Sequence, residues 1–374
     1  GGHKVISCQT LVQILEKWAP KKLAMDWDNT GLAIGDLSGE VSRVLLTLTV
    51  TPKSVEFAAK NSYEMIISHH PLFFSPLKSL KRDTALGKII YKAIKNDIVI
   101  YSAHTNLDVA SGGINDILAE RFNLEQVQVL KQTYRESLFK LVVFVPIAYA
   151  DAVRNAMCDA GAGHIGNYSH CTFNTDGIGT FVPLAGTSPF IGEQNKLERT
   201  DEIRIETIVP EGILKRVINA MIKAHPYEEV AYDIYPLENP GKEFGLGRIG
   251  YVKEPITLKE FCKTVKHKLN IPYLRVVGDL NKKISKVALC GGAGADLIQA
   301  AAFFGADVLV TGDIKYHEAL DAEDLGLAVI DAGHFATENI VLPALKEYLE
   351  EQTKLLKKEV KISVYEDVDP FVTI

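Results

Sequence analysis

A pattern that occurs in two distant parts of the chain places the strongest constraint on its fold. Residues 329–338 predict a buried strand that passes through a glycine turn into a helix, where His334 and Glu338 stand four residues apart and share a face. Residues 99–108 have the same build, with His104 and Asp108 at the same spacing. Two strand-to-helix connections of this kind predict a duplicated scaffold with a site between its halves.

The surrounding segments extend this correspondence. In each half, apolar strands alternate with helices, and this alternation predicts two layered α/β units rich in βαβ connections. The expected strands are 44–48, 65–68 and 98–102 in the first half, and 286–289, 306–310 and 327–330 in the second. The glycine turn at 291–294 is a weak phosphate-loop candidate, and close packing of a helix on a strand is the favoured interpretation.

The pattern changes near residue 127. A β-α-β-β run and then a β-α-β run follow, and paired βαβ units of this size predict a ferredoxin-like α+β domain. Its expected strands are 141–145, 171–173, 180–183, 204–209 and 231–236, and its helices are 150–160 and 212–224. We therefore expect an α/β half at 1–126, an inserted domain at 127–245 and a second α/β half at 246–374.

Composition excludes several classes of protein. The chain has 47% hydrophobic and 24% charged residues and a net charge of −6, which is typical of a globular protein and gives no basic surface for nucleic acid. It contains no apolar run of the length that spans a bilayer. Five scattered cysteines without a CxxC pair predict reduced thiols, and no secretory signal is recognisable, so we expect a cytoplasmic protein.

Candidate metal ligands follow the predicted strands. Open α/β sheets place their sites at the carboxyl ends of the strands, and five donor side chains fall there: His69, His70, Asp108, His334 and Glu338. Adjacent residues of a strand point to opposite faces, so His69 and His70 suit two different ions. Three imidazoles and two carboxylates without thiolates suit zinc first, with iron, manganese, cobalt or nickel as alternatives. Five ligands exceed the need of one catalytic zinc, and they suit a pair of ions that share a carboxylate.

The loop at 25–36 allows two interpretations. Asp28 and Asn29 are common turn formers, which favours a structural loop. Loops of this kind also carry ligand contacts, and in that case Trp27 and Asn29 are the substrate-binding candidates.

Five motifs together resemble the NIF-three-like family (the domain of unknown function thirty-four), whose members are often labelled homologues of a type 2 GTP cyclohydrolase I. They are Trp-Asp-Asn-Thr-Gly-Leu from residue 27, Ser-His-His-Pro from 68, Ala-His-Thr-Asn-Leu-Asp from 103, Thr-Gly-Asp-Ile-Lys-Tyr-His-Glu from 311 and Asp-Ala-Gly-His-Phe-Ala-Thr-Glu from 331. The middle segment is similar to the PII/CutA-like insertion of the long bacterial members.

The resemblance implies how the ligands are shared. One ion is expected on His69, Asp108 and Glu338, and a second on His70, His334 and the same Glu338. It implies that His104, Asp313 and His317 lie near the ions without binding them, and that the protein is a ring-shaped homohexamer. Thr49 stands where the family pattern has an aspartate, which questions one supporting contact.

These features predict a dinuclear metal-binding protein, a metal-dependent hydrolase of a nucleotide or a related phosphorylated or heterocyclic small molecule. The alternative is a protein without catalysis, a metal-handling or regulatory scaffold whose PII-like insert senses a ligand. Purely structural ions remain a third possibility.

Overall fold

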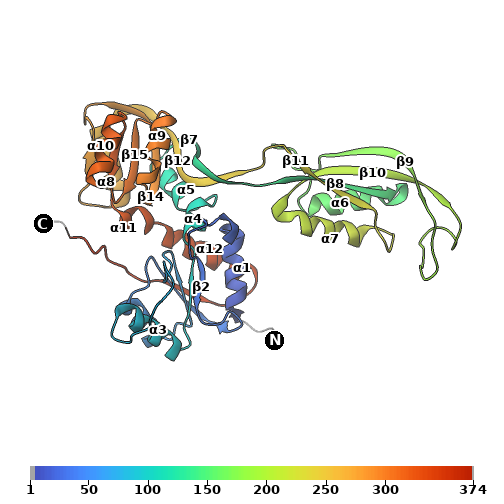
Figure 1. Ribbon diagram of the computed structural model, residues 1–374, viewed down its shortest axis with the longest axis horizontal. Helices are drawn as coiled ribbons and strands as arrows, with labels where there is room; N and C mark the ends of the chain where they lie inside the picture. Colours follow the sequence, from blue (N-terminus) through green and yellow to red (C-terminus); the bar gives the residue numbers. More distant parts are fainter. Residues whose placement is uncertain (1–4, 373–374) are drawn as a thin grey trace. The chain divides into compact units, whose positions relative to one another are not determined.

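The computed structural model describes residues 5–372 (Figure 1). It separates into two compact units. One consists of the chain up to Tyr134 and again from Phe244 onward, and the other is Arg135–Glu243. Each unit is described by itself below.

The first sheet of the larger unit contains the three parallel strands predicted for the first half. Its order is β17-β4-β5-β6-β2, in which β2 alone runs antiparallel to its neighbour. The bounds are β17 Lys361–Val364, β4 Arg43–Thr47, β5 Met65–Ser68, β6 Val99–Ser102 and β2 Gly31–Ile34. Helices α2 (Pro52–Lys60) and α3 (Ala85–Lys95) connect the parallel strands, and Thr51 caps α2 as expected.

The second sheet of this unit repeats the parallel arrangement. Its order is β13-β16-β15-β14-β12-β7, and β14, β15 and β16 are parallel. The bounds are β13 Arg275–Val277, β16 Ala328–Asp331, β15 Val308–Gly312, β14 Lys283–Ala293, β12 Glu243–Thr257 and β7 Glu125–Arg135. The helices of this half include α8 (Leu258–Leu269), α9 (Ile298–Phe303) and α10 (Tyr316–Asp324).

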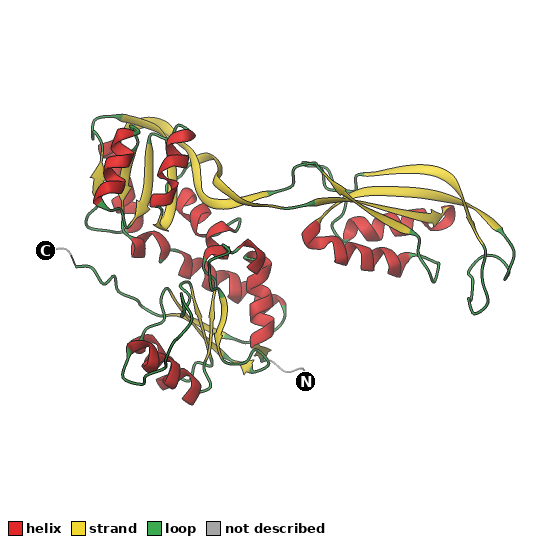
Figure 2. Ribbon diagram, in the orientation of Figure 1, coloured by secondary structure: helices red, strands yellow, loops and turns green. Residues whose placement is uncertain are grey.

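One hydrophobic core is common to both sheets. Strand β5 is buried along its whole length, and its side chains alternate between two clusters, as expected for a parallel sheet covered on both faces. The cluster that contains Ile67 of β5 also contains Val308 of β15 and residues of the helices α1 (Cys8–Trp18) and α12 (Val341–Leu355). Because residues of both sheets belong to this one cluster, the core packs the two sets of strands into one unit. Figure 2 shows the two sheets of this unit in yellow, with helices in red between them.

The smaller unit is an antiparallel sheet covered on one face by two helices. The chain runs β8 (Leu138–Pro146), α6 (Ala150–Asp159), β9 (Thr172–Phe181), β10 (Glu198–Pro210), α7 (Leu214–Ala224) and β11 (Tyr232–Leu237). The strand order is β11-β8-β10-β9, and the helices pack on the face that carries Leu141, Val143 and Ile205. This β-α-β-β-α-β path is the ferredoxin-like order.

Two expectations for individual strands were wrong. The expected separate strands at 171–173 and 180–183 are one strand, β9, which pairs with β10 along its whole length. Two glycines, Gly177 and Gly179, lie between the two expected strands, and Gly179 allows a close contact. A Cβ there would lie 2.1 Å from the carboxylate of Glu202 on β10.

Strand β7 was not expected from the sequence. Its polar side chains gave no buried-strand pattern, because it lies at the edge of the sheet beside β12. Its neighbour β12 contains the glycine-rich segment 244–250, and that segment is a strand rather than a phosphate loop. None of the helices in residues 5–372 combines the length and apolar character that crossing a bilayer requires.

Candidate metal centre

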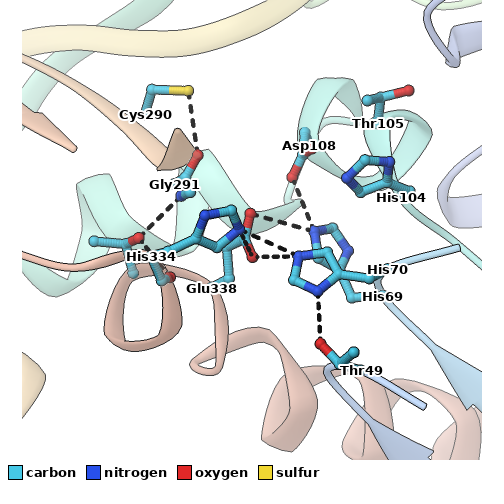
Figure 3. A network of polar contacts seen from close by, with 12 residues as sticks. Thr49, His69, His70, His104, Thr105, Asp108, Cys290, Gly291, His334 and Glu338 are labelled. Carbon is cyan, nitrogen blue, oxygen red and sulfur yellow. Dashed lines mark hydrogen bonds and ion pairs between the residues drawn. The ribbon is translucent and has the colours of Figure 1, made fainter. Parts of the chain in front are cut away.

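The five predicted ligands meet at the carboxyl ends of the parallel strands of the larger unit (Figure 3). His69 and His70 follow β5, and their backbone amides donate to Thr47 and Leu48 of the neighbouring strand end. Asp108 lies in α4 (Thr105–Val109), just after β6. His334 and Glu338 begin and end α11 (His334–Glu338), a single helical turn after β16.

Glu338 stands between two groups of donors, and each of its oxygens faces one of them. Oε1 lies 3.6 Å from Nε2 of His69, which is itself 3.6 Å from Oδ1 of Asp108. Oε2 lies 2.9 Å from Nε2 of His70 and 3.0 Å from Nε2 of His334. Ligand atoms in each group lie within 4.8 Å of one another, so each group could hold one ion.

The three imidazoles are oriented through their other ring nitrogen. Nδ1 of His69 donates to the carbonyl of Ala103 at 2.8 Å, and Nδ1 of His334 donates to Asp313 at 2.7 Å. Nδ1 of His70 shares a hydrogen bond with the hydroxyl of Thr49 at 2.7 Å. A histidine held in this way presents Nε2 to a metal.

Two buried polar atoms in this cluster have no hydrogen-bond partner among the described residues, although they lie 3.6 Å from each other. They are Nε2 of His69 and Oδ1 of Asp108, and both side chains are almost fully enclosed. Leaving such atoms unpaired costs free energy that native proteins rarely accept without a bound water or ion. The donor set therefore fits a divalent ion between His69, Asp108 and Glu338.

The pKa values of the side chains in this cluster depend strongly on one another. Burial lowers the pKa of His69, but the charges of Asp108 and Glu338 outweigh burial and raise it to about 9. The hydrogen bond that His334 donates to the Glu338 carboxylate raises the pKa of His334 to about 9 as well. Burial raises the pKa of Asp108 to about 6. The pKa of Glu338 lies well below its usual value, because the facing imidazoles outweigh its burial. Glu338 is therefore ionised at neutral pH, as a bridging ligand must be.

Asp28 has a larger role than a turn former. Its carboxylate accepts hydrogen bonds from Nδ1 of His104 at 2.9 Å and from the backbone and hydroxyl of Thr105 at 3.0 and 2.6 Å. Burial opposes ionisation, but these bonds lower the pKa of Asp28 to about 2. The ring of His104 then lies 5.1 Å from that of His69 and 5.6 Å from that of His70.

Residues that the sequence did not single out also hold the donor side chains in place. Asn115 of α5 (Ile114–Arg121) donates to the carbonyl of Asp108 and accepts from the amide of Gly291, so it joins the two halves. Gly292 has φ +69°, and a Cβ there would lie 2.2 Å from Oε1 of Glu338. The glycine turn at 291–294 therefore allows the close approach of α11 to β14, as its favoured interpretation expected. No motif around Asn115 could have identified it.

The remaining candidates lie around this cluster. Trp27 is exposed, with its ring 6.1 Å from that of His104. Asn29 donates to the carbonyl of Phe73, and Asp313 binds His334. His317 is exposed and contacts the ring of Tyr316, and the donor groups found in residues 5–372 do not include it.

Comparison with known proteins identifies relatives along nearly the whole chain. The family model Duf34/NIF3 (NGG1p interacting factor 3) matches residues 6–370. A protein of Halalkalibacterium halodurans named "GTP cyclohydrolase 1 type 2 homolog" is 50% identical over 374 residues, which cover 99% of this chain and 100% of the relative. A Bacillus subtilis protein of the same name is 47% identical over 369 residues, covering 98% and 99%.

Solved structures agree with these matches. A Bacillus cereus protein described as related to NIF3 has a TM-score of 0.93 and 49% identity, with 99% of each chain covered. A Staphylococcus aureus protein has a TM-score of 0.76 and 32% identity, also with 99% of each chain covered.

Proposed function

The chain belongs to the Duf34/NIF3 family, and we propose that it is a dinuclear metal-dependent hydrolase. The observation that carries this proposal is the position of Glu338, whose Oε1 and Oε2 face separate donor groups. A single-ion site does not need both oxygens of one buried carboxylate turned toward different sets of imidazoles. Such a division suits a bridging ligand.

When bound, paired divalent ions act as Lewis acids on a substrate oxygen and lower the pKa of a nearby water. The protein's own residues prepare the site for them. Ala103, Thr49 and Asp313 fix the three imidazole rings, so that little reorganisation is needed when substrate arrives. Glu338 and Asp108 supply negative charge that offsets the charge of the ions in a buried position.

We expect zinc to be the metal, because a mixed set of imidazoles and carboxylates without thiolates suits it. Other first-row ions bind the same ligands and are the alternatives. The substrate class is a nucleotide or a related phosphorylated or heterocyclic compound. The names of the relatives from H. halodurans and B. subtilis support this class.

The domain division forms part of the same proposal. We assign residues 1–126 and 246–374 to two duplicated halves, because β4, β5 and β6 of one sheet match β14, β15 and β16 of the other as sets of parallel strands, and donors follow both sets. Residues 127–245 are then a PII/CutA-like insertion that regulates the site or assembles the protein. A cytoplasmic homohexamer is the form that the family resemblance implies.

A reconstitution experiment tests the proposed activity. The protein is stripped with a chelator, reloaded with zinc or manganese, and assayed for hydrolysis of a panel of nucleotides, phosphate monoesters and phosphodiesters. We expect hydrolysis of at least one compound to return with the metal, and Glu338→Gln to lower it by about 100-fold or more, since even supporting residues at such sites contribute 10- to 100-fold. The control is Glu350→Gln on the exposed side of α12, which leaves the rate unchanged. Metal that exchanges freely, with no turnover on any compound, would favour a metal-handling protein.

A further inference from the structure

Two large aromatic side chains are exposed beside the metal centre. Trp27 is 65% exposed and Phe74 is 68% exposed, values that are unusual for side chains of this size. Their rings lie 6.1 and 6.3 Å from the ring of His104, and both meet it edge-on at 76° and 85°. No ring contact joins Trp27 to Phe74 within residues 5–372, so the two rings flank His104 without covering each other.

Polar contacts hold the two loops that carry these aromatic rings. The side chain of Asn29 donates to the carbonyl of Phe73 at 2.9 Å, which ties the loop of Trp27 to the loop of Phe74. On the other side of Trp27, the backbone amide of Met25 donates to the hydroxyl of Thr105 at 2.9 Å, and Asp28 binds the same hydroxyl and His104. Trp27 is thus exposed although its neighbours on both sides are anchored.

Anchoring the chain around an exposed aromatic ring reduces the entropy that is lost when a ligand binds to the ring. A ring that is already ordered loses little conformational entropy when a ligand packs on it, so its apolar area contributes more to affinity. Two such rings favour a flat ligand. Stacking on an aromatic side chain requires a planar π-face on the ligand, but it accepts many different rings.

Trp27 and Phe74 lie close to the donors of the metal centre. His104, which both rings flank, is itself 5.1 Å from His69 and 5.6 Å from His70, measured between ring centroids. When a planar group packs on Trp27 and Phe74, its substituents therefore lie next to the two groups of metal-binding donors. Asn29 acts in this arrangement as a positioning residue.

We propose that Trp27 and Phe74 form a subsite for a planar aromatic ring of the substrate, while the hydrolysable group of the same molecule faces the donors. This inference rests on the proposed function and narrows its substrate class. It selects compounds with a base or another flat heterocycle over aliphatic phosphates.

Calorimetric titration of the metal-loaded protein tests the proposal with two probes that differ only in the base. Guanosine monophosphate carries a planar base, and ribose 5-phosphate lacks it. We expect guanosine monophosphate to bind at least about 5-fold more tightly, since stacking on one aromatic side chain contributes roughly 5- to 150-fold, or about 1–3 kcal/mol. Trp27→Ala and Phe74→Ala should each remove most of this preference, and Trp27→Phe should retain most of it.

Matched controls separate this subsite from general effects. Phe303→Ala removes a phenylalanine on α9 that is even more exposed than Phe74, and it should leave the affinity for both probes unchanged. Asn29→Ala should reduce the preference for guanosine monophosphate without changing the affinity for ribose 5-phosphate. Metal content, measured for every variant, should remain that of the unsubstituted protein.

Several outcomes would overturn the proposal. They are equal affinity for the two probes, binding of neither, and a base preference that survives Trp27→Ala combined with Phe74→Ala. With metal content intact, these results reject the aromatic subsite alone. Loss of the metals from the unsubstituted protein under the same conditions would instead count against the dinuclear site itself.

Discussion

At the scale of single residues, the proposed centre depends on hydrogen bonds that turn Nε2 of each imidazole toward the donor cluster. Thr49 is the clearest case, because its hydroxyl is the partner of Nδ1 of His70 at 2.7 Å. The resemblance to the family leads us to expect an aspartate at this position, and in this chain the threonine hydroxyl supplies a neutral contact to the imidazole.

Replacing Thr49 by alanine should weaken one ion selectively. Without the hydroxyl, the ring of His70 is free to rotate, and we expect the affinity of the ion on His70, His334 and Glu338 to fall by about 10- to 100-fold. The ion on His69 and Asp108 should bind as before. Competition with a chromophoric chelator measures both affinities. Thr49→Ser keeps the hydroxyl and serves as the control, and equal affinities in the alanine and serine variants would contradict this role.

The raised pKa values of two histidines predict proton release on metal binding. In the metal-free protein, His69 and His334 have pKa values of about 9, so both hold a proton at neutral pH. A metal binds the neutral imidazole, and loading at pH 8 should therefore expel about two protons per chain. The affinity should rise with pH up to about 9. Titration calorimetry in buffers of different ionisation enthalpy measures the proton count. Ordinary histidines near 6.5 would release almost none at pH 8.

Which residues belong to the site was largely predictable from the sequence, but their contacts were not. Histidines and carboxylates at the ends of apolar strands identified the donors, since strand ends are where such sheets carry function. Asp28 looked like a turn residue because its partner, His104, is distant in sequence. Asn115 carries no motif, and its bonds to Asp108 and Gly291 exist only once both halves are folded.

At the scale of elements, the glycine-rich end of β14 determines how closely α11 approaches. Gly292 and Gly305 have nearly the same backbone, with φ +69° and +71°, but different surroundings. A Cβ at Gly292 would meet Glu338, whereas a Cβ at Gly305 meets nothing within 4 Å.

This pair of glycines allows a matched test. Alanine at either position suffers the strain of a left-handed residue, about 1–2 kcal/mol. Only Gly292→Ala should also lose metal, because Glu338 is buried and has little room to move. Elemental analysis and thermal melting of both variants separate the two effects. If Gly292→Ala bound metal as well as Gly305→Ala, the close approach would not matter for the site.

The accuracy of the predicted elements varied for a physical reason. The parallel strands and their helices were predicted to within a few residues, because burial on both faces produces continuous apolar runs such as Met65–Ser68. Strand β7 is polar and lies at an edge, and the glycines of β9 resemble a turn. In both cases pairing with a neighbouring strand, rather than the local sequence, determines the structure.

At the scale of the whole molecule, the ligand groups exist because one core spans both halves. Ile67 and Val308 belong to the same buried cluster, so the donors that follow β5 and β16 are fixed relative to each other. The sequence predicted a site between halves from their repeated pattern. Strand alternation separated His69 from His70. The assignment of Asp108, His334 and Glu338 to the two ions came from the family resemblance, because spacing along the chain does not determine which side chains meet.

The most direct test of the bridging role of Glu338 is the number of metal ions per chain, measured by mass spectrometry on the intact protein and on three variants. We predict two ions in the unsubstituted protein, one in Asp108→Asn, one in His334→Gln, and almost none in Glu338→Ala, with circular dichroism unchanged throughout. A Glu338→Ala variant that keeps both ions, or an unsubstituted protein that never binds more than one, would contradict the account.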